Sequence, residues 1–211
     1  MAGVVGGVVT YKIVNKVDKS KPPVLVKQLK KAIYNDDKTE CLEIGYFKNS
    51  HGEIQIETLP WTIKKVPKEL PKQITSLNRA FHLNLNSQIT NLDNWNTSNI
   101  TNMEWMFTGA QKFNQDLSKW DVSKVTNMYS MFAGSKMFNQ DISKWDTSNV
   151  TDMSFMFYKA SNFKQNISSW NVSNLLRIAI IENGITYTGW TDFNKNAHPD
   201  FKGNKLPSFP K

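Results

Sequence analysis

Residues 138–157 read FNQDISKWDTSNVTDMSFMF, and a close copy, FNQDLSKWDVSKVTNMYSMF, stands before them at residues 113–132. The two copies begin 25 residues apart. Four further columns keep the same spacing: Trp95, Trp120, Trp145 and Trp170; Met103, Met128 and Met153; Met106, Met131 and Met156; and Phe107, Phe132 and Phe157. A fixed period of this length is the signature of a tandem-repeat architecture, in which stacked units share one core.

The repeats have irregular ends. Upstream, Ile74, Leu77 and Phe81 start a degenerate unit that lies 26 residues, not 25, before the next one. Downstream, Leu175, Ile178 and Ile181 fit the slots of Val150, Met153 and Met156 before the pattern fades. Atypical ends are expected where terminal units must cap a stack. We therefore expect an apolar segment and linker at 1–23, a cap at 24–73, four repeats at 74–174, and a second cap with a tail at 175–211.

Each unit divides into two predicted elements. Met103, Met106, Phe107 and Ala110 lie at i, i+3, i+4 and i+7, which favours one face of a short helix. Residues 116–120 favour a short strand before a turn. A strand and a short helix in each unit is the leucine-rich-repeat plan. The predicted fold class is therefore α/β: a short leucine-rich-repeat-like solenoid with a parallel strand ladder.

The flanking segments predict the caps. Leu25, Leu29, Ala32 and Ile33 form a helical stripe over residues 24–34, and two alternating segments around residues 49–52 predict a β-hairpin. A helix and a hairpin would together cap the N-terminal end, and a degenerate repeat would cap the other. Residues 206–210 predict an extended tail.

Charge narrows the range of partners. The 211-residue chain has a formal net charge of +8, but 24 of its 26 basic residues are lysines. The surplus lies mainly in the flanks, because residues 74–174 carry eight basic and seven acidic side chains. Nucleic-acid recognition relies heavily on arginine. We therefore expect no nucleic-acid partner and retain polyanion binding only as a minor alternative.

The sequence contains no recognised catalytic motif. Its three histidines stand far apart, and the single Cys41 excludes an intramolecular disulfide framework. We predict that the protein is not an enzyme and binds no cofactor. Rows of Asp and Asn in the repeats would suit calcium, but we favour a structural role in which these side chains accept hydrogen bonds from turn amides.

The repeat motif FNQDISKWDTSNVTDMSFMF, together with the lead-in residues 45–49 and 66–71, resembles the BspA-type leucine-rich-repeat surface proteins. It is most similar to the 25-residue-repeat lipoproteins of wall-less bacteria. The resemblance implies a surface-exposed protein that binds host or matrix molecules, and it brings no catalytic or cofactor residues.

The resemblance also implies a membrane anchor, a signal peptide or a lipobox cysteine near the N-terminus. Residues 2–9, AGVVGGVV, are apolar but too short to span a bilayer. Residues 1–14 fit the end of a truncated anchor, an interfacial segment or a leading strand. We favour the anchor, which would hold the protein at the cell surface.

Positions that vary between units predict the contact surface. Trp105, Tyr129, Phe155 and Tyr158 lie off the Met/Phe face, and we predict that they form an exposed aromatic patch. Lys119 and Lys144 would lie on the strand face. The predicted function is adhesion through these six residues to a host or extracellular protein. The alternative is a structural or antigenic coat without a specific ligand, and the oligomeric state stays open.

Overall fold

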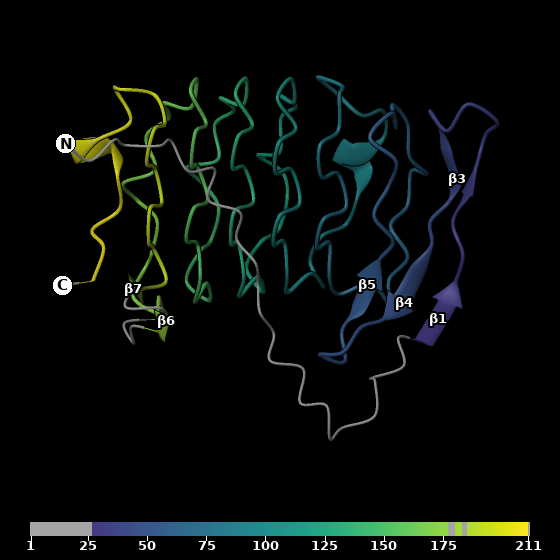
Figure 1. The fold of residues 1–211 in the computed structure, drawn as a ribbon, viewed down its shortest axis with the longest axis horizontal. Helices are drawn as coiled ribbons and strands as arrows, with labels where there is room; N and C mark the ends of the chain where they lie inside the picture. The colour runs from purple at the N-terminus through teal and green to yellow at the C-terminus, as the bar shows by residue number, and fades with distance from the viewer. Residues whose placement is uncertain (1–26, 177–179, 183–184, 211) are drawn as a thin grey trace, which may run out of the picture.

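A computed structural model describes residues 27–176, 180–182 and 185–210. These residues form small antiparallel sheets near the two ends of the chain, with a long run of turns between them (Figure 1). The strands are β1 (Lys27–Lys30), β2 (Ile33–Tyr34), β3 (Cys41–Glu43), β4 (Tyr46–Lys48), β5 (Ile54–Ile56), β6 (Ile180–Glu182) and β7 (Ile185–Tyr187). Two 3₁₀ turns complete the elements, η1 (Leu92–Asn94) and η2 (Gly203–Lys205).

The predicted fold class is wrong. The described residues contain no α-helix, and the multi-residue strand pairings among them are antiparallel, so the chain is not an α/β solenoid with a parallel strand ladder. Successive repeats instead meet at single parallel bridges, such as Ser76 with Asn102, Asn102 with Asn127, and Asn127 with Asp152. We use "layer" for one repeat of the chain lying beside the next; Figure 1 shows the layers side by side.

Backbone hydrogen bonding explains why the repeat helix is absent. Between Met103 and Ala110, alternate N–H groups donate to the next layer, as Met103 does to the Asn127 carbonyl at 2.9 Å. Of the intervening N–H groups, that of Glu104 donates to the side-chain oxygen of Asn102, and the others donate three residues back, as Met106 does to Met103 at 3.2 Å. Consecutive turns therefore bury the side chains at i, i+3, i+4 and i+7 without any helical i→i−4 bonding. The four predicted core residues are fully buried, although the element that carries them is different.

Two other predicted elements are also wrong. Residues 116–120 form a turn and not a strand, with the Trp120 N–H donating to the Leu117 carbonyl at 3.1 Å. The predicted N-terminal helix is replaced by β1 and β2, and Leu29 and Ile33 of its apolar stripe are exposed. Leu25 lies outside the described residues.

The predicted hairpin is present at the N-terminal end. β4 pairs with β5 in register, Tyr46 opposite Ile56 and Lys48 opposite Ile54. The turn is closed by Asn49, whose side-chain oxygen accepts the N–H groups of His51 and Glu53. Cys41 begins β3 and is buried, where a free cysteine packs as a small apolar side chain. Burial raises the pKa of its thiol to about 12.

The core consists of aromatic columns that run through the layers. Phe81, Phe107, Phe132 and Phe157 stack with ring centroids 5.5–5.7 Å apart. A second column, Phe113, Phe138 and Phe163, packs against the first at 4.0 Å in each layer. The four repeat tryptophans are at most 5% exposed and also belong to the core.

The C-terminal end contains a layer that the sequence pattern did not reveal. The Met153 N–H donates to the Gly189 carbonyl, 36 residues on, whereas the equivalent bonds in earlier layers span 24 or 25 residues. The β6–β7 hairpin is inserted at this point, and the Gly189 N–H returns to the Leu176 carbonyl. The downstream slots predicted for Ile178 and Ile181 are therefore taken by residues from 189 onward. Ile178 and the side chain of Ile181 lie outside the described part.

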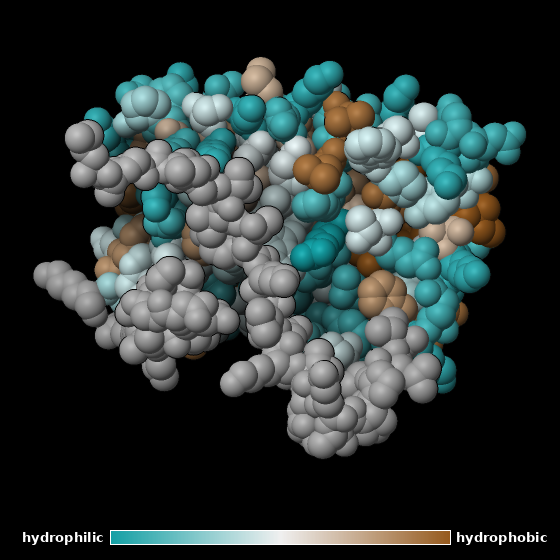
Figure 2. All heavy atoms as spheres, viewed as in Figure 1, coloured by the Kyte–Doolittle hydropathy of each residue, from teal (hydrophilic) through white to brown (hydrophobic). Residues whose placement is uncertain are grey.

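The predicted extended tail packs back on this last layer. Leu206 has an extended backbone, and the Phe209 ring lies 6.1 Å from Trp190 and 5.1 Å from Phe193. Where Figure 2 draws the face in colour, most residues are hydrophilic and the hydrophobic residues form small separate groups. The described part of the chain holds no helix with the length and apolar character needed to cross a bilayer. The predicted anchor at residues 1–14 lies outside the described part.

Candidate binding surface

The predicted aromatic residues project from a turn with an unusual backbone. Trp105 and Phe155 have positive φ angles of 55° and 59°, and the equivalent Arg79 and Ser130 have 58° and 53°. A bulky residue in this left-handed region costs about 1–2 kcal/mol, so neighbouring structure must hold it. Bonds between layers do so: the Trp105 N–H donates to the Tyr129 carbonyl, and the Phe155 N–H to that of Thr191, each at 2.9 Å.

The four aromatic side chains meet in one continuous row. Trp105 contacts Tyr129 edge to face at 5.5 Å, Tyr129 contacts Phe155 at 5.5 Å, and Phe155 contacts Tyr158 at 6.0 Å. Such edge-to-face pairs contribute beyond the area that they bury. We call these four residues the aromatic row. It runs across three layers, and the structure brings together every aromatic residue predicted for the patch.

The row is less exposed than expected. Trp105, Tyr129 and Tyr158 are half-buried, and Phe155 is only 5% exposed, so its predicted exposure is wrong. Phe155 lies between two other aromatic rings, and its backbone is bonded to the inserted C-terminal layer. Because the sequence pattern did not reveal that layer, it gave no sign that Phe155 would be covered.

A cation lies at each end of the row. The Arg79 guanidinium carbon is 4.2 Å from the centre of the Trp105 ring, and the Lys159 Nζ is 5.1 Å from that of Tyr158. Both distances are within the range of cation–π attraction. These basic groups were not predicted, because their unit-to-unit equivalents are not basic and no periodic signal marked them.

A column of carboxylates and amides lies in the neighbouring slots of the same turns. Glu104 Oε2 accepts from Asn78 Nδ2 at 3.0 Å and Asn127 Nδ2 at 3.4 Å, and Asn102 Nδ2 donates to both carboxylate oxygens of Glu53. Burial raises the pKa of Glu104 to about 7, with Asp152 and Glu53 adding to the rise and Arg79 opposing it. This carboxyl group therefore titrates near neutral pH.

Lys119 and Lys144 lie elsewhere in the layers, in the turn that replaces the predicted strand. Both are exposed. The pKa of Asp116 is lowered mainly by the N–H of Ser118, and that of Asp141 by the N–H of Ser143; each neighbouring lysine adds a smaller effect in the same direction. The two lysines thus lie beside carboxylates in the Asp116 and Asp141 turns, and the aromatic row occupies another turn of the layer.

The side chains of the Asp and Asn rows accept hydrogen bonds from backbone N–H groups, as predicted. Side-chain oxygens accept the N–H two residues on, at 2.8–3.1 Å, in Asn96, Asp116, Asp121, Asp141, Asp146, Asn166 and Asn171. These are Asx turns, in which the side-chain oxygen replaces a backbone carbonyl as the acceptor. Within the described ranges, no three His, Cys, Asp or Glu side chains are grouped as a metal site would require.

Comparison with known proteins gives one match. Residues 75–196 match the model of a family described as "Mycoplasma protein of unknown function, DUF285". Neither a curated protein nor a solved structure matches the chain significantly. The match fits a surface-associated repeat protein of a wall-less bacterium, and it does not extend to the leucine-rich-repeat type. Because the matched segment covers more than half of the 211 residues, the protein belongs to the DUF285 family.

Proposed function

We propose that the protein is a non-enzymatic interaction module displayed at the cell surface, and that the aromatic row contacts an extracellular host protein. The observation that carries this proposal is the continuous contact from Trp105 to Tyr158, with Arg79 at one end. Tryptophan, tyrosine and arginine are the residues enriched at the energetic centres of protein interfaces.

The strained, left-handed backbone of Trp105 and Phe155 supports a role of the aromatic row in binding. Glycine adopts a left-handed backbone at the lowest cost, and the chain uses it at Gly109 and Gly134, with φ of 70°. Trp105 and Phe155 occupy left-handed positions with large side chains instead. Strained bulky residues gather where their orientation serves a function.

Binding of the fluorescently labelled protein to cultured host cells tests the proposal. We expect saturable binding that weakens by tenfold or more in Trp105→Ala and in Tyr129→Ala, because interface aromatics of this kind contribute about 1.4 kcal/mol or more. Phe155 is excluded from the series because its replacement would disturb the core. The matched control is Met137→Ala, which removes an exposed apolar side chain in another turn.

A surface coat without a specific ligand is the second candidate. It predicts no saturable binding to cells and no effect of either aromatic substitution. Equal binding by the control and the aromatic variants would exclude the row as the contact surface. Binding that fell steeply with salt would instead favour polyanion attraction, the minor alternative.

A further inference from the structure

One tryptophan of the repeat column differs from the others in its hydrogen bonding. Trp95, Trp145 and Trp170 each donate their indole N–H to a carbonyl 28 residues earlier, those of Pro67, Leu117 and Ile142, at 3.0–3.1 Å. Trp120 is 5% exposed, and its Nε1 is buried without a hydrogen-bond partner among the described residues. A buried donor left unpaired costs about 1–3 kcal/mol, so this group points to a missing acceptor.

The layer before Trp120 differs in its local backbone. The residue 28 positions earlier is Leu92, which begins the 3₁₀ turn η1. The turn follows Asn91, which has a positive φ of 72°, and no such 3₁₀ turn forms at the equivalent positions around Leu117 and Ile142. The Leu92 carbonyl accepts the backbone N–H three residues on, as the Leu117 and Ile142 carbonyls also do. Unlike those two carbonyls, it accepts no indole N–H.

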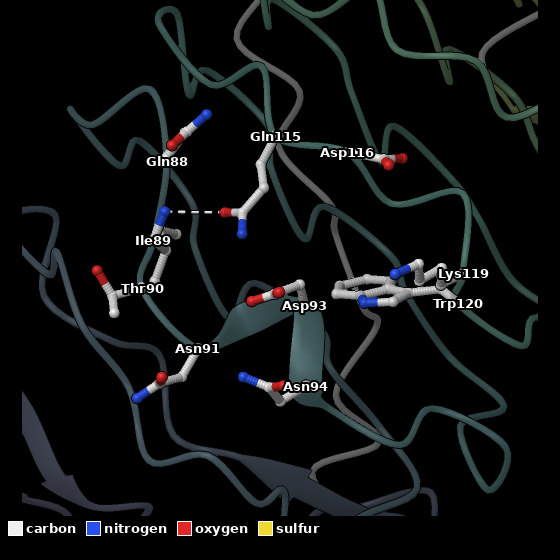
Figure 3. A pocket seen from close by; sticks show the side chains of 10 residues that line it. All are labelled: Gln88, Ile89, Thr90, Asn91, Asp93, Asn94, Gln115, Asp116, Lys119 and Trp120. Carbon is white, nitrogen blue, oxygen red and sulfur yellow. Dashed lines mark hydrogen bonds between the residues drawn. The ribbon is translucent and has the colours of Figure 1, made fainter.

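A pocket opens beside the unpaired Trp120 indole. Its volume is about 460 Å³, within the range of small-molecule sites. It is lined by Gln88, Ile89, Thr90, Asn91, Asp93, Asn94, Gln115, Asp116, Lys119 and Trp120. Figure 3 shows the Trp120 indole reaching from one side toward Asp93 and Asn94 on the other. We call this the Trp120 pocket.

The pocket presents donors and acceptors together. Asp93 and Asp116 offer carboxylates, Gln88 and Asn94 offer amides, and the indole N–H is a donor only. The Gln115 amide is fixed in the wall, because its Oε1 accepts the Ile89 N–H at 2.8 Å. The Asp116 pKa is lowered, mainly by the backbone N–H of Ser118, so this group is ionised at neutral pH.

The balance of charge restricts the ligand. Two carboxylates face a single lysine, Lys119, so the pocket disfavours phosphate, sulfate and carboxylate ligands. Hydroxyl groups suit the lining, because each hydroxyl both donates to a carboxylate and accepts from an indole or amide N–H. A ligand with several hydroxyls on a compact ring would satisfy the buried indole and the carboxylates at once.

We propose that the Trp120 pocket binds a neutral sugar residue, one oxygen of which accepts the Trp120 indole N–H. The carboxylate of Asp93, opposite the indole, accepts hydrogen bonds from the sugar hydroxyls, and the amide of Asn94 bonds to neighbouring oxygens. The site is separate from the aromatic row and does not depend on that row's proposed function.

Titration of the ¹⁵N-labelled full chain with glucose, galactose, mannose and N-acetylglucosamine tests the proposal by NMR. The Trp120 indole signal is assigned by its loss in Trp120→Phe. We expect at least one of these sugars to shift that signal saturably, while the indole signals of Trp145 and Trp170 stay in place. Shifts that rise linearly and equally at all indoles, or no shift at all, mean that water alone satisfies Trp120 and overturn the proposal.

A matched pair of surface variants separates a loss of sugar binding at the pocket from a loss caused by misfolding. Asp93 and Asp141 are both exposed, and only Asp93 lines the Trp120 pocket. We expect Asp93→Asn to weaken sugar binding by about tenfold, because a charged acceptor is lost, and Asp141→Asn to leave it unchanged. Equal weakening by both, or a stronger response to sulfate than to any sugar, overturns the proposal. Trp105→Ala should leave the sugar titration unchanged, so failure of the aromatic row and failure of this pocket are distinguishable.

Discussion

At the residue scale, Asp and Asn side chains shape the chain as much as the apolar core does. In each repeat, one of them accepts the backbone N–H two residues on at the turn after the tryptophan: Asn96, Asp121, Asp146 and Asn171. These side chains supply the turn bonds that a helix or sheet would otherwise supply. Since both Asp and Asn occupy this slot, the side-chain oxygen rather than the charge is the common requirement.

This requirement predicts the effect of replacing Asp121. Asp121 accepts the Ser123 N–H at 2.9 Å and the Ser123 hydroxyl at 2.6 Å. Asp121→Ala should lower the free energy of unfolding by about 1 kcal/mol, whereas Asp121→Asn should cost less than half of that. Urea unfolding at pH 7 measures both. Equal losses would show that charge, and not the turn bond, is what Asp121 contributes.

Glu104 makes stability depend on pH. Its pKa in the folded protein is about 7, above the ordinary value of 4.5. Between these pH values the folded state keeps a proton that the unfolded chain has lost, so stability from this group falls as pH rises from about 4.5 to 7. Glu104→Gln removes the titration, and its Oε1 still accepts from Asn78.

Urea unfolding at pH 4.5, 6 and 7.5 tests this dependence. We expect the free energy of unfolding of Glu104→Gln to be closest to that of the wild type at pH 4.5. At each higher pH, the variant should become more stable relative to the wild type. Glu69→Gln, a substitution at an exposed position, serves as the control. Its free energy of unfolding should differ from that of the wild type by the same amount at each pH. A constant difference between Glu104→Gln and the wild type would contradict the predicted titration.

At the scale of elements, burial was predictable and secondary structure was not. The period identified Met103, Met106, Phe107 and Ala110 as core, and all four are fully buried. The same spacing arises from consecutive turns, because the alternate N–H groups that bond to the next layer leave no mark in the sequence. Only Gly109, with its φ of 70°, signals a left-handed turn in this stretch.

The two candidate sites were likewise predictable from the sequence only in part. Variation between units located the aromatic row, but the exposure of Phe155 depended on a layer displaced by the β6–β7 hairpin. The Trp120 pocket has a sequence signal, the spacing of 26 residues in the degenerate unit. That signal acquires a meaning only when the structure shows η1 in this unit and the Trp120 indole N–H without an acceptor.

The displaced layer depends on close backbone approach at Gly189. A Cβ there would lie 2.4 Å from the Thr151 carbonyl oxygen and 2.9 Å from the Leu176 nitrogen, both backbone atoms. Gly189→Ala should therefore destabilise the protein by about 1–3 kcal/mol. Hydrogen exchange should quicken at the N–H groups of Met153 and Phe155, which bond to this layer. Those of Met103 and Trp105 should change less; uniform acceleration would show that the loss is global and not local.

At the scale of the whole molecule, the stack is held together mainly by contacts between neighbouring layers. Each Phe column pairs a ring with the rings one repeat before and after it, and the interlayer backbone bonds join neighbouring repeats. Proteins of this kind gain stability roughly layer by layer. Aromatic rings turned edge-on, Phe193 and Phe201 against Phe157, close the C-terminal end of the column. The C-terminal end is therefore specialised, and we expect the middle layers to be interchangeable.

Interchangeable layers predict that one repeat can be removed without loss of the fold. Deleting residues 126–150 joins Val125 to Thr151, which replaces Thr126 by its equivalent and places Phe157 on Phe107 in the register that Phe132 now has. We expect a folded, cooperatively unfolding protein with a lower midpoint and an m-value smaller by roughly a tenth, because less surface is buried. Deleting 126–149, one residue fewer, shifts every later side chain by one position and should abolish cooperative unfolding. Circular dichroism with urea titration compares the two; if they behave alike, packing between specific neighbours does not hold the layers together.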